Sequence, residues 1–308
     1  MVAQIILLSP LVRQPLFSTR GFHSAFLRST GGLLRLPPQI RRRLTHGGLR
    51  LYVAEAVNFE AMAIVQDGIG ALLVTAGAYS LVFAFDELTK RNIIKQVWVF
   101  NSEQSLSRKV VHVLSGLLYM ASWPIFSSSI EAKYFVAVAP LLNCIRLLAY
   151  GFSIFTDESL VNSVTREGKS EELLRGPLYY VVVLMFCAIF FWRESPVGII
   201  SVAMMSGGDG FADIIGRKFG SVKLPYNCKK SWIGSISMFI FGSLFSILML
   251  YYFSILGYLY LDWRVTPEKV FLVSLAATLV ESLPFSEVID DNITVPVTSM
   301  LTASLLFT

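Results

Sequence analysis

The chain has 308 residues, of which 54% are hydrophobic and 15% charged, with a net charge of +5 and a mean hydropathy of +0.62. Soluble domains carry about 25% charged residues, so this composition argues against a soluble domain and indicates a membrane protein. The basic residues fall in loops between apolar runs, which argues against nucleic-acid binding. The three cysteines form no Cys-x-x-Cys pair, so neither a disulfide framework nor a zinc site is expected.

The first fifty residues differ from the rest of the chain, because they are rich in arginine and serine and contain no lysine or acidic residue. This pattern is typical of organellar transit peptides, and we predict that residues 1–50 are a cleaved address. A secretory signal fits less well, since no basic residue precedes the apolar run IILLSPLV. A basic tail at the membrane surface is the alternative. Residues 51–67 are then the N-terminal segment of the mature protein, and residues 68–308 are one polytopic membrane domain.

Apolar segments follow one another along the remainder of the chain. A helix needs roughly 17 to 25 apolar residues to cross a bilayer. The predicted spans are residues 68–85, 110–128, 134–152, 177–192, 196–215, 232–256, 270–284 and 292–308. The fourth and seventh are short, so the predicted fold class is an all-α polytopic membrane protein with about seven or eight transmembrane helices.

The basic residues support this count of spans. With eight spans, the loops after the first, third, fifth and seventh lie on one face, and most basic residues fall in them: Lys90, Arg91, Lys95, Arg108, Lys109, Arg166, Lys169, Arg175, Arg217, Lys218, Lys223, Lys229 and Lys230. The opposite loops offer only Lys133, Arg193, Arg264 and Lys269. By the positive-inside rule, the basic face is cytosolic, stromal or on the matrix side.

The fifth span ends in SGGDGFADIIGRKFG, residues 206–220, which contains two aspartates four residues apart. On a helix, Asp209 and Asp213 project from one side about one turn apart and can share a ligand. Carboxylates at membrane depth are costly and usually line a polar cavity or bind a cation, so we predict a metal site here. Alternatively, Asp213 pairs with Arg217 one turn on. Glycines nearby remove side-chain bulk and let a backbone or a phosphate approach: Gly208, Gly210 and Gly216.

The next loop, GSVKLPYNCKKSWIGS, supplies positive charge and hydrogen-bond donors. Ser231 is predicted to cap the following helix, whose first N–H groups attract anions. Two carboxylates facing a row of lysines suit a metal–polyphosphate substrate, with oxygen ligands for Mg²⁺ and ammonium groups for the phosphates. The alternative is that the lysines only set the topology. The predicted phosphate-binding residues are Lys223, Asn227, Lys229, Lys230 and Ser231.

Further polar residues extend the candidate site. The loop ESLPFSEVIDDN lies on the same face and adds Glu281, Asp290, Asp291 and Asn292. Asp290 and Asp291 alternatively form a turn that caps the last span. Within earlier spans lie His112, Asn143 and Arg146. Polar groups inside spans are candidate functional residues, and a buried arginine needs an internal acceptor or a phosphate.

Several stretches together resemble the polyprenol kinase family: SRKVVHVLSGLLYM, ELLRGPLYYV, GGDGFADIIGRKFG, KLPYN followed by KKSWIGSISMF, ATLVESLP and DDNITVP. Within that family the plastid phytol kinases are the most similar, and the plastid farnesol kinases are close to them. The resemblance implies a membrane enzyme that typically uses CTP to phosphorylate an isoprenoid alcohol. For phytol kinases, the alcohol is phytol and the phytyl phosphate enters tocopherol synthesis. The resemblance also implies a plastid transit peptide and a stromal basic face.

The residues and the resemblance suggest one mechanism. The phosphates of CTP bind the loop lysines, Asp209 and Asp213 hold Mg²⁺, and the alcohol hydroxyl attacks the γ-phosphate in line. Asp290 or Asp291 could orient or deprotonate the hydroxyl, although phosphoryl transfer does not require a dedicated base. Three alternatives stay open: a farnesol or geranylgeraniol kinase, a cytidylyltransferase that releases pyrophosphate, and an ion-coupled transporter. No internal repeat of the kind that transporters often show is evident.

Overall fold

The computed structural model describes residues 46–90, 103–155, 161, 165, 169–284 and 289–307. The chain divides into two units, residues 1–61 and 62–308. In the first unit the described residues form the beginning of helix α4 (His46–Lys90), which ends in the second unit. Most of the predicted transit peptide lies outside the described residues, as do three predicted loop charges: Arg91, Lys95 and Arg166.

The second unit is built almost entirely of helices. After α4 these are α6 (Glu103–Ala121), α7 (Ala132–Gly151), α9 (Gly176–Phe190), α10 (Pro196–Ala203), α11 (Asp209–Phe219), α12 (Trp232–Ile255), α13 (Thr266–Ser282) and α14 (Asp291–Leu306). Two 3₁₀ turns, η2 (Trp123–Ile125) and η3 (Ser170–Leu174), precede α7 and α9, and a π-helical turn, η4 (Met204–Gly208), joins α10 to α11. An antiparallel hairpin of β1 (Lys223–Leu224) and β2 (Asn227–Ser231) connects α11 to α12, with Lys223 opposite Ser231.

Each of the eight predicted spans overlaps a helix, but α6 ends at Ala121 and so covers only residues 110–121 of the predicted span 110–128. Five described helical stretches are long and apolar enough to cross a membrane: Glu60–Phe85, Ala132–Gly151, Ser170–Phe190, Pro196–Phe219 and Trp232–Ile255. The other predicted spans overlap α6, α13 and α14, of which the last two have 17 and 16 residues. The predicted class, an all-α polytopic membrane protein, is confirmed.

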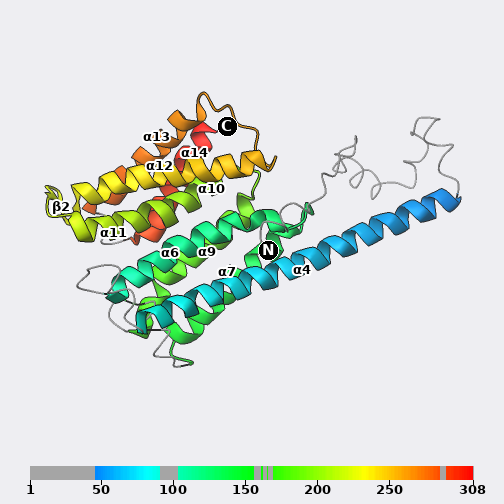
Figure 1. Ribbon diagram of the computed structural model, residues 1–308, viewed down its shortest axis with the longest axis horizontal. Coiled ribbons are helices and arrows are strands. Elements are labelled where there is room, and N and C mark those ends of the chain that lie inside the picture. The colour runs from blue at the N-terminus through cyan, green and yellow to red at the C-terminus, as the bar shows by residue number, and fades with distance from the viewer. Residues whose placement is uncertain are drawn as a thin grey trace. The chain divides into compact units, whose positions relative to one another are not determined.

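The helix that carries Asp209 packs closely on α12, as Figure 1 shows. Small residues allow this approach, because a Cβ added at Gly208 would lie 3.3 Å from Cα of Gly242. A Cβ added at Gly216 would lie equally close, 3.3 Å, to Cα of Gly234. Such small-residue contacts are a common way for membrane helices to bring their backbones together.

The same contacts bear on the predicted role of the glycines near Asp209. Gly208, Gly210 and Gly216 are expected from the sequence to let a backbone or a phosphate approach. Gly208 and Gly216 lie against the backbone of α12, which is the first of these alternatives, while Gly210 faces Val113 of α6. The glycines are therefore explained by helix packing, and the start of α11 is held between α6 and α12.

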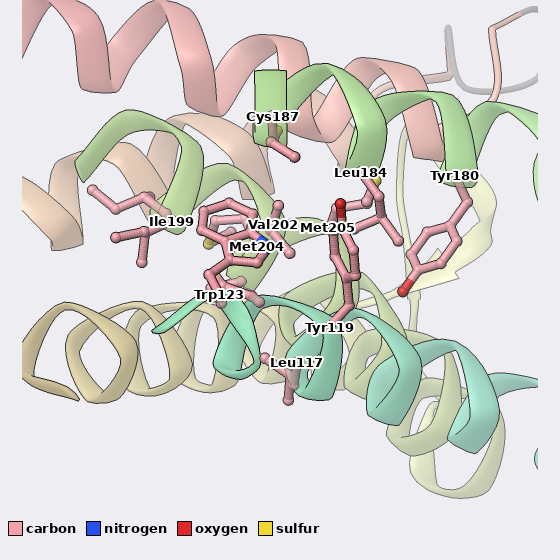
Figure 2. Close-up of a cluster of buried hydrophobic side chains, with 14 of the residues drawn as sticks. Leu117, Tyr119, Trp123, Tyr180, Leu184, Cys187, Ile199, Val202, Met204 and Met205 are labelled. Carbon is pink, nitrogen blue, oxygen red and sulfur yellow. The ribbon is translucent and has the colours of Figure 1, made fainter. Parts of the chain in front are cut away.

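Aromatic and sulfur-containing side chains fill the centre of the second unit. Figure 2 shows Tyr119 and Trp123, from α6 and η2, meeting Met204 and Met205 of the π-helical turn. Trp123 is fully buried and lies 5.5 Å from the ring of Trp192, centre to centre. This core fixes α6 against the α10–α11 helix, and both of these helices carry candidate site residues.

A buried polar cluster fixes the loop after α6. Arg193, only 2% exposed, donates to the carbonyls of Trp123 at 3.1 Å, Phe126 at 2.9 Å and Ser127 at 2.5 Å. Asp67 of α4, fully buried, accepts from the backbone N–H of Ser127 at 2.6 Å and from its hydroxyl at 2.8 Å. Two buried charges thus hold one turn of the chain, Asp67 through its carboxylate oxygens and Arg193 through its two terminal nitrogens, while Arg193 Nε has no hydrogen-bond partner among the described residues.

Candidate active site

Asp209 begins α11 directly after the π-helical turn, a feature that often occurs at functional sites. His112 of α6 supports this turn, since its Nε2 lies 3.2 Å from the carbonyl oxygen of Met205. A carbonyl only accepts, so Nε2 is the protonated nitrogen. The ring of His112 packs 4.0 Å from that of Tyr180, whose hydroxyl donates to the His112 carbonyl at 2.7 Å. His112, a predicted candidate, therefore helps to position Asp209.

Three carboxylates from three helices converge at this point. They belong to Asp209, to Glu281 near the end of α13 and to Asp291 at the start of α14. One oxygen of each lies within 4.8 Å of the others, and Asp209 and Glu281 are 4% and 3% exposed. Among the described residues, Glu281 Oε2 and Asp291 Oδ1 have no hydrogen-bond partner. Carboxylate oxygens are the ligands that Mg²⁺ prefers, so this group fits a divalent cation.

Two ammonium groups reach the same carboxylates. Lys109 Nζ of α6 lies 2.9 Å from Asp209 Oδ2, while Lys230 of β2 donates to Glu281 and, at 2.8 Å, to Asp291 Oδ2. Burial alone lowers the pKa of Lys230, but the carboxylates of Glu281 and Asp291 outweigh it and raise this pKa above its ordinary value. Lys230 therefore stays charged beside the three carboxylates.

The second aspartate of the predicted metal pair has different partners. Asp213 Oδ1 accepts from Arg217 Nε at 2.7 Å, and Asp213 Oδ2 lies 4.0 Å from Lys109 Nζ. The ion pair of Asp213 with Arg217, four residues on, is the alternative to a shared metal site that the sequence spacing allows. The carboxylates that the structure gathers around Asp209 are thus Glu281 and Asp291, where the sequence predicts Asp213.

The neighbouring Asp290 and Asn292 also have structural partners. Asp290 Oδ1 accepts from the backbone N–H of Asn292 at 2.9 Å, so Asp290 caps α14 as the sequence alternative proposes. The Asn292 amide donates to Asp290 at 2.8 Å and to the carbonyl of Gly176 at 3.3 Å. This cap fixes the start of α14 and hence Asp291.

The predicted phosphate-binding residues separate into two groups. Lys223 and Lys229 are exposed on the hairpin. Ser231 accepts from the N–H of Gly234 at 3.2 Å, which confirms the predicted cap of α12. Asn227 is buried, and its amide donates to the carbonyls of Ser282 at 3.1 Å and Leu283 at 3.4 Å. In this structure Asn227 ties the hairpin to the end of α13, and its role as a donor to phosphate stays a prediction.

Arg146 and Asn143 lie apart from the helices that bear the three carboxylates, on α7. The Arg146 guanidinium lies over the rings of Tyr79, at 5.1 Å, and Tyr150, at 5.9 Å. An arginine inside a predicted span needs an internal partner, and these cation–π contacts supply one.

Sequence reasoning missed the roles of Lys109 and Tyr180. Lys109 is treated there only as a loop charge, although it precedes His112 by one helical turn and so shares its face. Tyr180 stands in an apolar run without any local signal of its partners.

Comparison with known proteins gives the chain close relatives. It is 63% identical over 245 residues to "Probable phytol kinase, chloroplastic" of Zea mays, covering 80% of this chain and 78% of the relative. It is 57% identical over 245 residues to "Phytol kinase 1, chloroplastic" of Arabidopsis thaliana, with the same two shares of 80% and 78%. It is 40% identical over 252 residues to "Farnesol kinase, chloroplastic" of Arabidopsis thaliana, covering 82% and 79%. No protein-family model and no solved structure matches.

Proposed function

The chain belongs to the chloroplast phytol kinase family, and from this premise we propose that it phosphorylates phytol within a plastid membrane, with CTP as the phosphate donor. The observation that carries the proposal is the group formed by Asp209, Glu281 and Asp291 together with Lys109 and Lys230. Carboxylates and ammonium groups side by side suit a substrate that brings both a metal ion and phosphates.

We assign the cation to Asp209, Glu281 and Asp291, because one oxygen of each lies within 4.8 Å of the others and because Glu281 Oε2 and Asp291 Oδ1 have no hydrogen-bond partner among the described residues. A bound Mg²⁺ would neutralise charge on the phosphates of the nucleotide. Lys109 and Lys230 add fixed positive charge beside it, and the exposed Lys223 and Lys229 attract the nucleotide from the aqueous side. By the positive-inside rule we place this side in the stroma.

In the proposed step, the hydroxyl oxygen of phytol forms a bond to the γ-phosphorus while the bond from that phosphorus to the bridging oxygen breaks. CDP leaves, and the hydroxyl proton passes to water or to the transferred phosphate. The protein contributes position and charge neutralisation, which supply most of the catalysis in phosphoryl transfer. An alcohol with a long hydrocarbon tail is dissolved in the bilayer, so a polytopic enzyme meets it there. The phytyl phosphate formed is a precursor for tocopherol synthesis.

The test is label transfer in membranes of a host that lacks this activity and expresses the full chain. The membranes receive γ-labelled CTP, Mg²⁺ and, separately, phytol, geranylgeraniol or farnesol. We expect label mainly in phytyl phosphate. Label chiefly in farnesyl phosphate would move the chain to the farnesol kinases, and release of pyrophosphate in place of CDP would indicate a cytidylyltransferase. If folded protein transfers label to none of these alcohols, the proposed kinase activity is refuted.

A matched pair of variants tests the site. Asp209→Asn should lower the transfer rate at least about 100-fold, as expected for a group that neutralises transition-state charge. Asp213→Asn makes the same chemical change one turn away and should cost less than about tenfold, since Asp213 pairs with Arg217. Equal losses would instead restore the Asp209–Asp213 metal pair that the sequence predicts.

A further inference from the structure

Lys230 contacts two of the three carboxylates at once. Its Nζ donates to Glu281 Oε1 and, at 2.8 Å, to Asp291 Oδ2. The Lys230 side chain is 22% exposed, whereas the Glu281 side chain is 4% exposed. The ammonium therefore holds the place between the carboxylates where a cation would bind, and the lysine, unlike Glu281, has a route to solvent.

The charges at this point are not balanced. Three carboxylates, those of Asp209, Glu281 and Asp291, face the two ammonium groups of Lys109 and Lys230. Glu281 Oε2, which is buried, and Asp291 Oδ1 also have no hydrogen-bond partner in the described part of the chain. Buried charge without compensation is costly. A divalent cation in place of Lys230 would balance the three carboxylates together with Lys109.

We infer, building on the proposed kinase function, that Lys230 is an exchangeable internal counter-ion. It holds Glu281 and Asp291 in the cation-free protein. When the metal–nucleotide enters, Lys230 leaves these carboxylates to the cation and binds a phosphate oxygen of the nucleotide. A lysine suits this exchange because its ammonium is a compact point charge on a flexible stem and pairs with carboxylate or phosphate alike. No covalent bond changes in the exchange.

The exchange couples two binding events. In the absence of a nucleotide, a cation must displace Lys230 without a phosphate to receive it, so the cation alone binds weakly. Once a phosphate is present, the Lys230 ammonium gains a phosphate oxygen as its partner, and the carboxylates of Glu281 and Asp291 gain the cation. By linkage, the cation strengthens phosphate binding by the same factor as the phosphate strengthens cation binding. Both effects pass through Lys230.

The test titrates purified full chain in nanodiscs with Mg²⁺ alone and measures the thermal unfolding temperature. In Lys230→Met no ammonium competes, so the Mg²⁺ concentration at half-maximal stabilisation should fall about tenfold, within the usual range of coupling. Lys223→Met is the matched control, since it removes the same charge from an exposed position of the same hairpin. Its half-maximal concentration should equal that of the wild type.

Lys230→Arg provides an opposite expectation and guards against a misfolded methionine variant. A guanidinium binds carboxylates through two parallel hydrogen bonds, so this variant should require more Mg²⁺ than the wild type. Pyrophosphate binding, measured by calorimetry, should strengthen on addition of Mg²⁺ in the wild type and lose most of that gain in Lys230→Met.

Several results would overturn the exchange. One is the same half-maximal Mg²⁺ concentration in the wild type and Lys230→Met. Another is a destabilised Lys230→Met protein that Mg²⁺ does not restore, which would make Lys230 a structural ion pair only. Lack of stabilisation by Mg²⁺ in the wild type and in every variant would also overturn the exchange. The label-transfer assay on the same preparations separates these failures from failure of the kinase function, because it reports phytyl phosphate whether or not Lys230 exchanges.

Discussion

Arg193→Met should destabilise the protein strongly, although Arg193 belongs to the loop between α9 and α10 and contacts none of the three site carboxylates. The change removes three hydrogen bonds from a charged donor to buried carbonyls of Trp123, Phe126 and Ser127. Each such bond contributes about 1.5 to 3 kcal/mol. Methionine carries no charge, so the variant avoids the cost of burying one, and this recovers part of the lost stability. Asp67 loses a nearby positive charge, which lowers the stability further. We therefore expect the free energy of unfolding to fall by about 3 kcal/mol.

For a chain of 308 residues, with an unfolding entropy of roughly 2.1 cal/mol/K per residue, that loss lowers the unfolding temperature by about 5 °C. The assay is thermal unfolding of the purified full chain in nanodiscs, compared with Arg264→Met. Arg264 is exposed in the loop before α13, so its replacement should change stability by less than about 0.5 kcal/mol. If both variants unfold at the wild-type temperature, the three carbonyl contacts do not stabilise the loop and the reasoning fails.

Two further predictions concern the supports of the site. Asn227→Ala removes two hydrogen bonds that tie the hairpin to α13, so the KM for the nucleotide should rise more than kcat falls, at a stability cost of about 1 to 3 kcal/mol. Initial-rate kinetics will measure both constants, with replacement of the exposed Cys228 by alanine as the control. A fall in kcat without a rise in KM would contradict this prediction. Gly242→Leu should overpack the contact of α12 with the π-helical turn, because a Cβ there would lie 2.7 Å from Cε of Met204 and 3.6 Å from Cα of Gly208. The expected cost is about 1 to 3 kcal/mol in thermal unfolding, whereas unchanged stability would show that Met204 and the helices have room to move.

The helices were predictable because hydropathy is a property of each segment by itself. Each of the eight apolar segments overlaps a helix, and the caps at Ser231 and Asp290 follow from residues next to the helix starts. The i, i+4 pair of Asp213 and Arg217 is equally local. Such features need no knowledge of which helix lies beside which.

The grouping of the site residues depends on neighbours in space, and sequence spacing does not give it. The sequence names Asp209, Glu281 and Asp291 as candidates, but nothing in it indicates that their oxygens meet. Lys109 contacts Asp209 across 100 positions of sequence. The amide of Asn227 has the donors needed to bind a phosphate or a backbone carbonyl. Only its hydrogen bonds to Ser282 and Leu283 show that it ties the hairpin to α13.

The three carboxylates also fix the order in which the site can arise during synthesis of the chain. Asp209 is translated first, Glu281 follows 72 positions later and Asp291 is the last of the three. Until α14 has been synthesised and packed, Lys230 lacks one of its two carboxylate partners and the proposed cation site lacks one of its three carboxylates. A nascent chain therefore holds an incomplete group of carboxylates until α14 has packed on α13, and in the proposed mechanism kinase activity begins only after that step.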